Sequence, residues 1–227
     1  MTAPVLELTG VTKNYGALRP LRLQQLVVAP GEQVALLGLD QPAAEVLINL
    51  VTGATLPDTG EVKVFGRATA EITESADWLT LLDRFGMVSE RAALLDAMTV
   101  IQNLALPFSL EIDPAPPDVA NQASALAREV GVAEQLWGRR AGELDAATRM
   151  QIRLARALAF NPGLLLLEHP SATLPREDVI RFGINVRLVA ERRSLAALTI
   201  TADAEFAGAV SSSAVALEPA TGHLLRL

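Results

Sequence analysis

The segment Pro30–Gly53 reads PGEQVALLGLDQPAAEVLINLVTG and decides the fold. It opens with the turn 29–32 and continues with the compact apolar run Gln33–Gly38, which is typical of a buried strand. Apolar residues then recur at helical spacing over Ala43–Val51 and stop at Gly53, which predicts a helix. A buried strand runs through a short loop into a helix here, as in the opening of a phosphate-binding α/β unit.

Strands and helices alternate along the rest of the chain. The predicted strands are Val5–Leu8, Leu21–Val28, Glu61–Phe65, Leu164–Leu167 and Ala197–Thr201, with a hairpin-like tail at 214–217 and 223–227. The predicted helices are Ala120–Val130, 145–160 and Glu177–Arg192, and the middle from Trp78 to Gly142 is expected to be mostly helical. This alternation implies a mostly parallel sheet that is covered on both faces.

Composition excludes several classes of protein. The chain has 227 residues, a formal net charge of −7 and no cysteine. A chain of this length can bury a large core without a disulfide or metal, and without cysteine it has no thiolate metal site and no cysteine nucleophile. A pI near 4.9 argues against general binding to nucleic acid or anionic lipid. Without an apolar stretch long enough to span a membrane, or a recognisable secretory signal, the chain is expected to be soluble and cytosolic.

Several stretches, in the right order, resemble the ATP-binding subunit of ABC transporters over essentially the whole chain. They are residues 30–38 (PGEQVALLG), 47–62, 98–107 (MTVIQNLALP) and 154–167 (LARALAFNPGLLLL). The resemblance implies an α/β, P-loop NTPase-like ABC ATPase fold with a mostly parallel core sheet and an antiparallel N-terminal β part. It also implies a single domain, 1–227, with an inserted helical subdomain at about residues 90–145.

The family's phosphate loop, G-x-x-x-x-G-K-[ST], is altered at three of its four key positions. The residues at the positions of the two glycines, the lysine and the hydroxyl are Gly38, Ala43, Ala44 and Glu45. Pro42 removes a backbone donor, and Asp40 and Glu45 add negative charge where a polyphosphate would bind. Like charges 4 Å apart cost about 4 kcal/mol at an effective dielectric constant of 20. We therefore expect Asp40 to cap the helix and Glu45 to complement the helix dipole, with no nucleotide bound.

The other motifs also differ from the family pattern at the positions that carry its chemistry. Glu168 and His169 stand where the resemblance places the Mg²⁺-holding aspartate and the glutamate that polarises water. Glu168 keeps a carboxylate and His169 an imidazole able to act as a base, and we interpret His169 as a strand-end polar residue. The signature motif, Leu-Ser-Gly-Gly-Gln in the family, reads LDAAT from residue 144, where Asp145 is expected to cap the following helix.

Three further positions complete the comparison with the family. Glu90 occupies the position of the family's glutamine that senses Mg²⁺ and the membrane partner, and Ala202 occupies the position of its switch histidine. Tyr15 keeps the aromatic ring that stacks on adenine in the family. A single aromatic residue at a strand end is more often a packing residue, so it adds little to the prediction.

These observations favour a degenerate ABC-type subunit that acts as a non-catalytic scaffold or regulatory subunit of a membrane transport complex. No catalytic residue, metal or cofactor is expected, and no nucleic acid. The expected partners are a membrane permease, through a groove near Glu90, or an intact ABC ATPase subunit, in a homo- or heterodimer at the inner face of the membrane. One alternative is a subunit that still binds or weakly hydrolyses ATP with Mg²⁺ through Tyr15, Glu168 and His169. Another keeps the fold and places a neutral or cationic ligand near Gly38.

Overall fold

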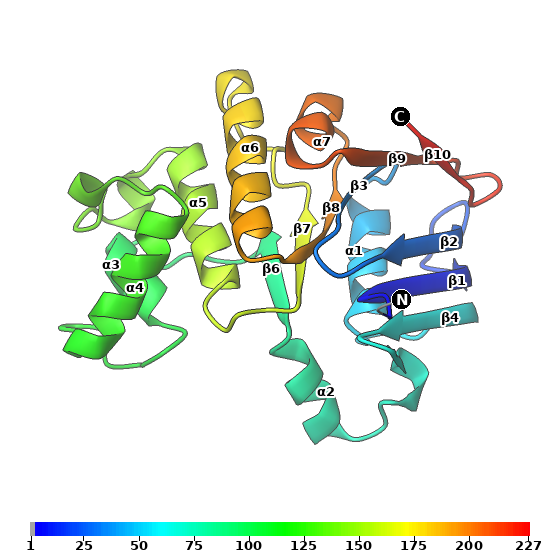
Figure 1. Cartoon of the computed structure of the whole chain (residues 1–227), viewed down its shortest axis with the longest axis horizontal. Coiled ribbons are helices and arrows are strands. Elements are labelled where there is room, and N and C mark those ends of the chain that lie inside the picture. The colour runs from blue at the N-terminus through cyan, green and yellow to red at the C-terminus, as the bar shows by residue number, and fades with distance from the viewer. Residues whose placement is uncertain (1–2) are drawn as a thin grey trace.

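The computed structural model describes residues 3–227, which form two sheets with helices around them (Figure 1). An antiparallel sheet has the strand order β2-β1-β4-β5, and a second sheet has the order β10-β9-β3-β8-β7-β6. Strands β9, β3, β8, β7 and β6 run parallel, and only β10 is antiparallel to its neighbour. The predicted fold class, a mostly parallel core sheet with an antiparallel N-terminal part, is confirmed.

The bounds of the elements are as follows. The strands are β1 (Leu6–Lys13), β2 (Leu21–Val28), β3 (Gln33–Leu37), β4 (Thr59–Val64), β5 (Arg67–Ala68), β6 (Phe85–Ser89), β7 (Leu164–Glu168), β8 (Ala196–Ile200), β9 (Ser213–Leu217) and β10 (Leu224–Arg226). The α-helices are α1 (Gln41–Val51), α2 (Ser75–Leu82), α3 (Val100–Ala105), α4 (Pro117–Glu129), α5 (Ala146–Ala157), α6 (Arg176–Arg192) and α7 (Ala204–Val210). Short 3-10 turns lie at Thr69–Glu71, Glu134–Leu136 and Ala141–Glu143.

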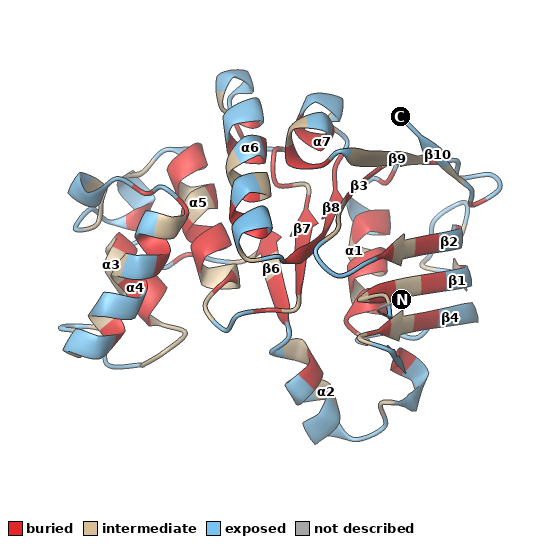
Figure 2. Ribbon diagram, viewed as in Figure 1, coloured by how far each residue is buried: buried red, intermediate tan, exposed pale blue. Residues whose placement is uncertain are grey.

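The larger sheet separates two hydrophobic cores, and its strands β6, β7 and β8 are buried (Figure 2). Alternate residues of β7 face opposite sides: Leu164 and Leu166 belong to the core that holds α1 and the antiparallel sheet. Leu165 and Leu167 belong to the core under α3 to α7. All four have an exposed fraction of 0%, which explains why this strand is an unbroken apolar run.

Strand β6 corrects the expectation that the middle of the chain, Trp78 to Gly142, is mostly helical. It pairs in parallel with β7 and forms the edge of the larger sheet. Gly86 is needed there, because a Cβ atom at this position would lie 2.5 Å from the carbonyl oxygen of Ala157. The strand is therefore fixed by contacts with β7 and α5 rather than by a local pattern.

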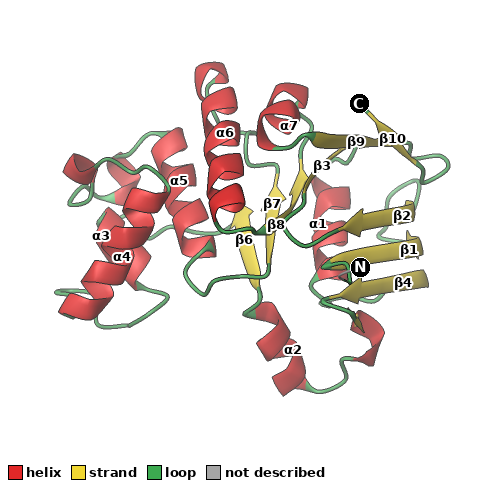
Figure 3. Cartoon of the chain, viewed as in Figure 1, coloured by secondary structure: helices red, strands yellow, loops and turns green. Residues whose placement is uncertain are grey.

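Helices α3 and α4 lie together with α5 at one end of the molecule (Figure 3). The stretch from 90 to 145 contains α3, α4 and two of the 3-10 turns, and the division of the chain at these bounds stays a prediction. Several predicted helix limits move. Helix α1 begins at Gln41 instead of Ala43, and α5 ends at Ala157 instead of residue 160. Helix α4 spans Pro117–Glu129 instead of Ala120–Val130, and α6 begins at Arg176 instead of Glu177. Within residues 3–227, no helix combines the length and the apolar character needed to cross a lipid bilayer.

Candidate functional site

The loop between β3 and α1 is shaped by one glycine and one aspartate. Gly38 has a φ angle of +91°, and a Cβ atom there would lie 2.8 Å from the carbonyl oxygen of Leu217, so the position favours glycine on both counts. Asp40 precedes α1, and its Oδ1 accepts a hydrogen bond of 2.9 Å from the backbone nitrogen of Ala43. The predicted helix cap is confirmed.

Helix α1 buries two of the residues at phosphate-loop positions. Ala43 and Ala44 have exposed fractions of 5% and 0% and belong to the core between the two sheets. Glu45 lies beyond the first turn of α1, and that turn holds no acidic residue. The expectation that Glu45 complements the helix dipole is therefore wrong.

A buried carboxylate ends strand β7. The Glu168 side chain is only 1% exposed, because β7 is covered on both faces, and a buried charge of this kind requires partners. Gln41 donates from Nε2 to Oε1 of Glu168 at 2.7 Å. Arg91 donates from one guanidinium nitrogen to both carboxylate oxygens, at 3.0 and 2.9 Å. The carboxylate is thus held by an amide and a guanidinium from elsewhere in the chain.

Arg91 is the residue that the sequence analysis missed. Its other terminal nitrogen lies 2.8 Å from Oε1 of Glu45, so one guanidinium bridges α1 and β7. Burial lowers the pKa of Arg91, but its hydrogen bonds with Glu168 and Glu45 outweigh burial and raise that pKa above the ordinary value. The side chain therefore remains charged, and Glu45 is neutralised by a cation instead of facing the loop unpaired.

Glu90, the neighbour of Arg91, joins two other elements. Its carboxylate lies 3.1 Å from the guanidinium of Arg153 in α5 and accepts a hydrogen bond of 2.6 Å from Thr173, which lies just before α6. Burial lowers the pKa of Arg153, and the charge of Glu90 opposes that shift. The segment after β6 is therefore tied to α5 and to the turn that follows β7.

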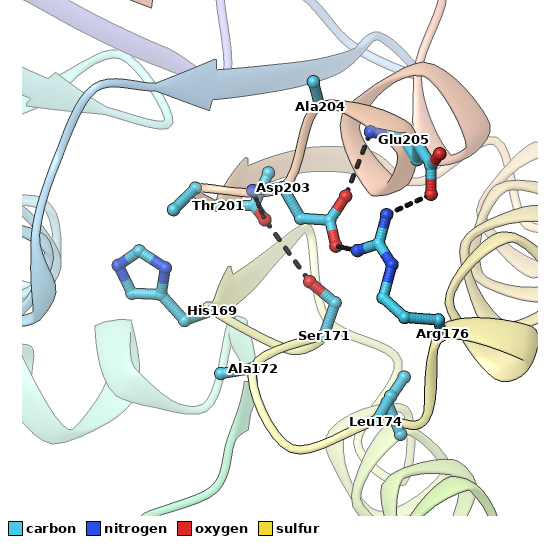
Figure 4. A pocket seen from close by; sticks show the side chains of 10 residues that line it. His169, Ser171, Ala172, Leu174, Arg176, Thr201, Asp203, Ala204 and Glu205 are labelled. Atoms are coloured by element: carbon cyan, nitrogen blue, oxygen red, sulfur yellow. Dashed lines mark hydrogen bonds and ion pairs between the residues drawn. The ribbon is translucent and has the colours of Figure 1, made fainter.

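His169 and Ala202 line one cavity of about 500 Å³ between β7, α6 and α7 (Figure 4). The backbone nitrogen of His169 donates to the Ile200 carbonyl at 2.8 Å, and the residue has a φ angle of +42°. Its Nε2 is buried and has no hydrogen-bond partner among the described residues. Arg176 closes the other side of the cavity by binding Asp203.

Tyr15 lies on a different cavity, together with Gly38, Asp40 and Ala43. This cavity has a volume of about 200 Å³. Burial and the nearby charge of Asp40 raise the pKa of the Tyr15 phenol. The ring also packs against the core that contains α1, as expected for a packing residue.

The predicted positions fall into separate groups. Arg91 bridges Glu45 and Glu168, whereas Glu90 pairs with Arg153. His169 and Ala202 share the cavity of about 500 Å³, and Tyr15, Gly38 and Ala43 share the cavity of about 200 Å³. Asp145 stands apart at the start of α5, where its Oδ1 accepts from the Thr148 backbone nitrogen at 2.7 Å, which confirms the predicted cap. Within residues 3–227, no group of three or more His, Asp or Glu side chains is placed to hold a metal ion.

The two sheets, with α1 entered from β3 through the short loop at Gly38, have the fold of an ABC ATPase cassette. The dimeric structure of MJ0796, a bacterial ABC transporter cassette, has the same fold: the TM-score is 0.78 at 20% identity, over 97% of both chains. The pattern of the ABC transporter family matches residues 22–172. The chain belongs to the ABC transporter family.

Two curated relatives illustrate the range of the family. The chain is 31% identical over 211 residues to the lipoprotein-releasing system ATP-binding protein LolD of Anaeromyxobacter dehalogenans, covering 91% of this chain and 88% of LolD. It is 26% identical over 217 residues to the methionine import ATP-binding protein MetN of Brucella abortus, covering 96% of this chain and 58% of MetN. The chain therefore spans most of LolD and little more than half of MetN.

Proposed function

We propose that this chain is a non-catalytic ABC subunit, a scaffold or regulatory component of a membrane transport complex. The observation that carries the proposal is the position of Arg91, whose guanidinium lies between Glu45 and Glu168. Both are motif positions that would face the Mg²⁺ ion of a bound nucleotide. Here a side-chain cation of the chain itself engages them.

The residues present do not fit ATP and Mg²⁺. Both oxygens of Glu168 are engaged by Arg91, and Oε1 also accepts from Gln41. The start of α1 is equally unsuited to an anion, since Asp40 already accepts from the backbone nitrogen of Ala43 and Pro42 has no N–H to offer.

A direct titration tests the proposal. A fluorescent ATP analogue is added to the purified chain with Mg²⁺, and an intact ABC ATPase serves as the positive control. We expect no saturable binding by this chain below about 1 mM, which corresponds to roughly −4.1 kcal/mol. Binding tighter than about 100 μM, roughly −5.5 kcal/mol, would overturn the proposal.

One observation favours a second candidate function, an ATPase subunit with residual activity. Tyr15 and Gly38 line the same cavity, so an aromatic ring and the first loop glycine still border one space. In that case His169 serves as the base, and steady-state ATP hydrolysis should fall in a His169→Ala variant. Equal rates in the two proteins would remove this candidate.

The proposed partner is a membrane permease, which would place the chain at the cytoplasmic face of the membrane. A cavity of about 390 Å³ beside Glu90 offers a docking groove. Its lining combines apolar side chains with two arginines: Phe85, Met87, Ala92, Leu106, Pro107, Arg153, Arg156, Ala157 and Phe160. An intact ABC ATPase subunit is the second proposed partner.

Co-purification with a permease encoded beside this gene tests the groove. Phe160 is 59% exposed at the groove, and Leu188 on α6 is 46% exposed outside it. Phe160→Asp should abolish co-purification, whereas Leu188→Asp should retain it. Retention by both variants would show that the permease binds elsewhere.

A further inference from the structure

Residues 90–93, which follow β6, are held by polar contacts on two opposite sides. On the core side, Arg91 binds Glu45 in α1 and Glu168 at the end of β7. The backbone nitrogen of Arg91 also donates to Oγ of Ser89 at 3.2 Å, and that of Ala92 to the Ser89 carbonyl at 3.0 Å. The side chain of Arg91 therefore extends from a turn with its own hydrogen bonds.

The helical side is held by two arginines of α5. Arg153 donates to the carbonyl oxygens of Ala92 at 3.1 Å and Glu90 at 3.4 Å, and Arg156 donates to the carbonyl of Ala93 at 2.6 Å. Arg153 is 5% exposed, so its contacts lie inside the protein. Helix α5 in turn shares a hydrophobic core with α3 and α4.

These contacts form a continuous polar path from α1 and β7, through residues 90–93, to α5. On the core side, the charge of Glu168 makes the contact with Arg91 costly to break. Glu168 is 1% exposed, and its nearest cation is Arg91, so moving Arg91 away would leave an unpaired buried carboxylate. Residues 90–93 could not move away from α1 and β7 without that separation, and α5 is joined to the same residues by Arg153 and Arg156.

We propose that Gln41, Glu45, Arg91 and Glu168 form a permanent clamp, which holds residues 90–93 and helices α3 to α5 in one position against the core without nucleotide. The inference rests on the proposed function, since in a chain that binds no ATP these polar contacts add to the hydrophobic core that α3 to α5 share with β7. It has a consequence for the partner: the groove lined by Phe85, Met87 and Arg153 is built from both sides of the clamped segment. Its shape therefore stays fixed, and the docking surface is always available.

The clamp can be tested by measuring the distance between two spin labels. The chain has no cysteine, so Thr9→Cys in β1 and Gln122→Cys in α4, both exposed, introduce the only labelling sites. Arg91→Gln removes the clamp. Arg67→Gln is the matched control, because Arg67 is also 48% exposed and paired with an aspartate, Asp77, away from the clamp.

We expect a narrow distance distribution in the parent protein, with and without Mg²⁺–ATP, a broad one in Arg91→Gln, and a narrow one in Arg67→Gln. Hydrogen exchange of the amides of residues 91 and 92 should be about a hundredfold faster in Arg91→Gln, which corresponds to about 2.8 kcal/mol at 1.4 kcal/mol per tenfold. If Arg91→Gln fails to fold, Glu45→Gln removes only the contact with α1 and should broaden the distribution to a smaller extent.

An Arg91→Gln distribution as narrow as that of the Arg67→Gln control would overturn the clamp, and so would a broad distribution in the parent protein. For Glu45→Gln, a distance distribution no broader than that of Arg67→Gln would likewise contradict the clamp. The proposed function is judged separately, by the nucleotide titration. A chain that binds ATP and still shows the Arg91-dependent distance change would refute the non-catalytic role and leave the clamp standing.

Discussion

Replacing Arg91 with glutamine should be more destabilising than replacing any exposed ion-pair residue of this chain. In the native protein Glu168 is 1% exposed and its carboxylate contacts Arg91 at 2.9 Å and Gln41 at 2.7 Å. After Arg91→Gln the carboxylate retains an amide partner but no cation. Breaking a buried ion pair costs about 3–5 kcal/mol, and because Arg91 itself is 48% exposed, water can partly replace it. We expect the free energy of unfolding to fall by about 2–3 kcal/mol.

Guanidinium unfolding of a four-protein set measures this effect. Glu45→Gln should cost only about 0.2–1 kcal/mol, because Glu45 and Arg91 are both half-exposed. The double variant Arg91→Gln, Glu168→Gln removes both charges of the pair, including the buried one of Glu168, and should recover to within about 1 kcal/mol of the parent. A loss below about 0.5 kcal/mol for Arg91→Gln, or a double variant no more stable than the single one, would refute the reasoning.

Two smaller predictions concern helix capping and pH. Asp145→Ala removes the cap on the Thr148 nitrogen and should lower the free energy of unfolding by about 1 kcal/mol in the same denaturation assay, and an unchanged midpoint would contradict this. Asp58 accepts from the Asn14 backbone nitrogen and from Lys13, and these hydrogen bonds, in that order, lower its pKa below 3.8. The stabilisation by ionised Asp58 is therefore fully present above pH 3.8 and is lost as the pH falls through the lowered pKa of the folded state. The difference in melting temperature between the parent and Asp58→Asn should therefore vanish in acid. A difference that stays constant from neutral to acid pH would count against that assignment.

Local signals account for the parts of the fold that could be predicted from the sequence. The strand and helix on either side of Gly38 follow from an apolar run and from apolar residues at helical spacing. Strand β6 could not be predicted in this way, because it contains Gly86 and owes its conformation to pairing with β7. Propensity within such a segment is overridden by its neighbours in the sheet.

The same division applies to the candidate site. The caps formed by Asp40 and Asp145 are local, since each accepts from a nitrogen three residues ahead, and both could be predicted. The partner of Glu168 is Arg91, 77 positions away in the sequence, and no spacing pattern connects them. A usable signal was nevertheless present: a carboxylate at the end of a fully apolar strand must find a cation or donors inside the protein. That requirement predicts that a partner exists without naming it.

The free energy needed to move Arg91 away from Glu168 also distinguishes the two candidate functions. Any Mg²⁺–nucleotide that reached the Glu168 carboxylate would first have to displace Arg91 from it. If that displacement costs about 2–3 kcal/mol, the apparent affinity is about 30- to 140-fold weaker than the loop would otherwise allow. A chain with a residual nucleotide site should therefore bind Mg²⁺–ATP more tightly once Arg91 is replaced by glutamine. A non-catalytic subunit should remain without measurable binding in the same variant, because Ala44 and Pro42 supply neither the cation nor the backbone donor that a phosphate requires.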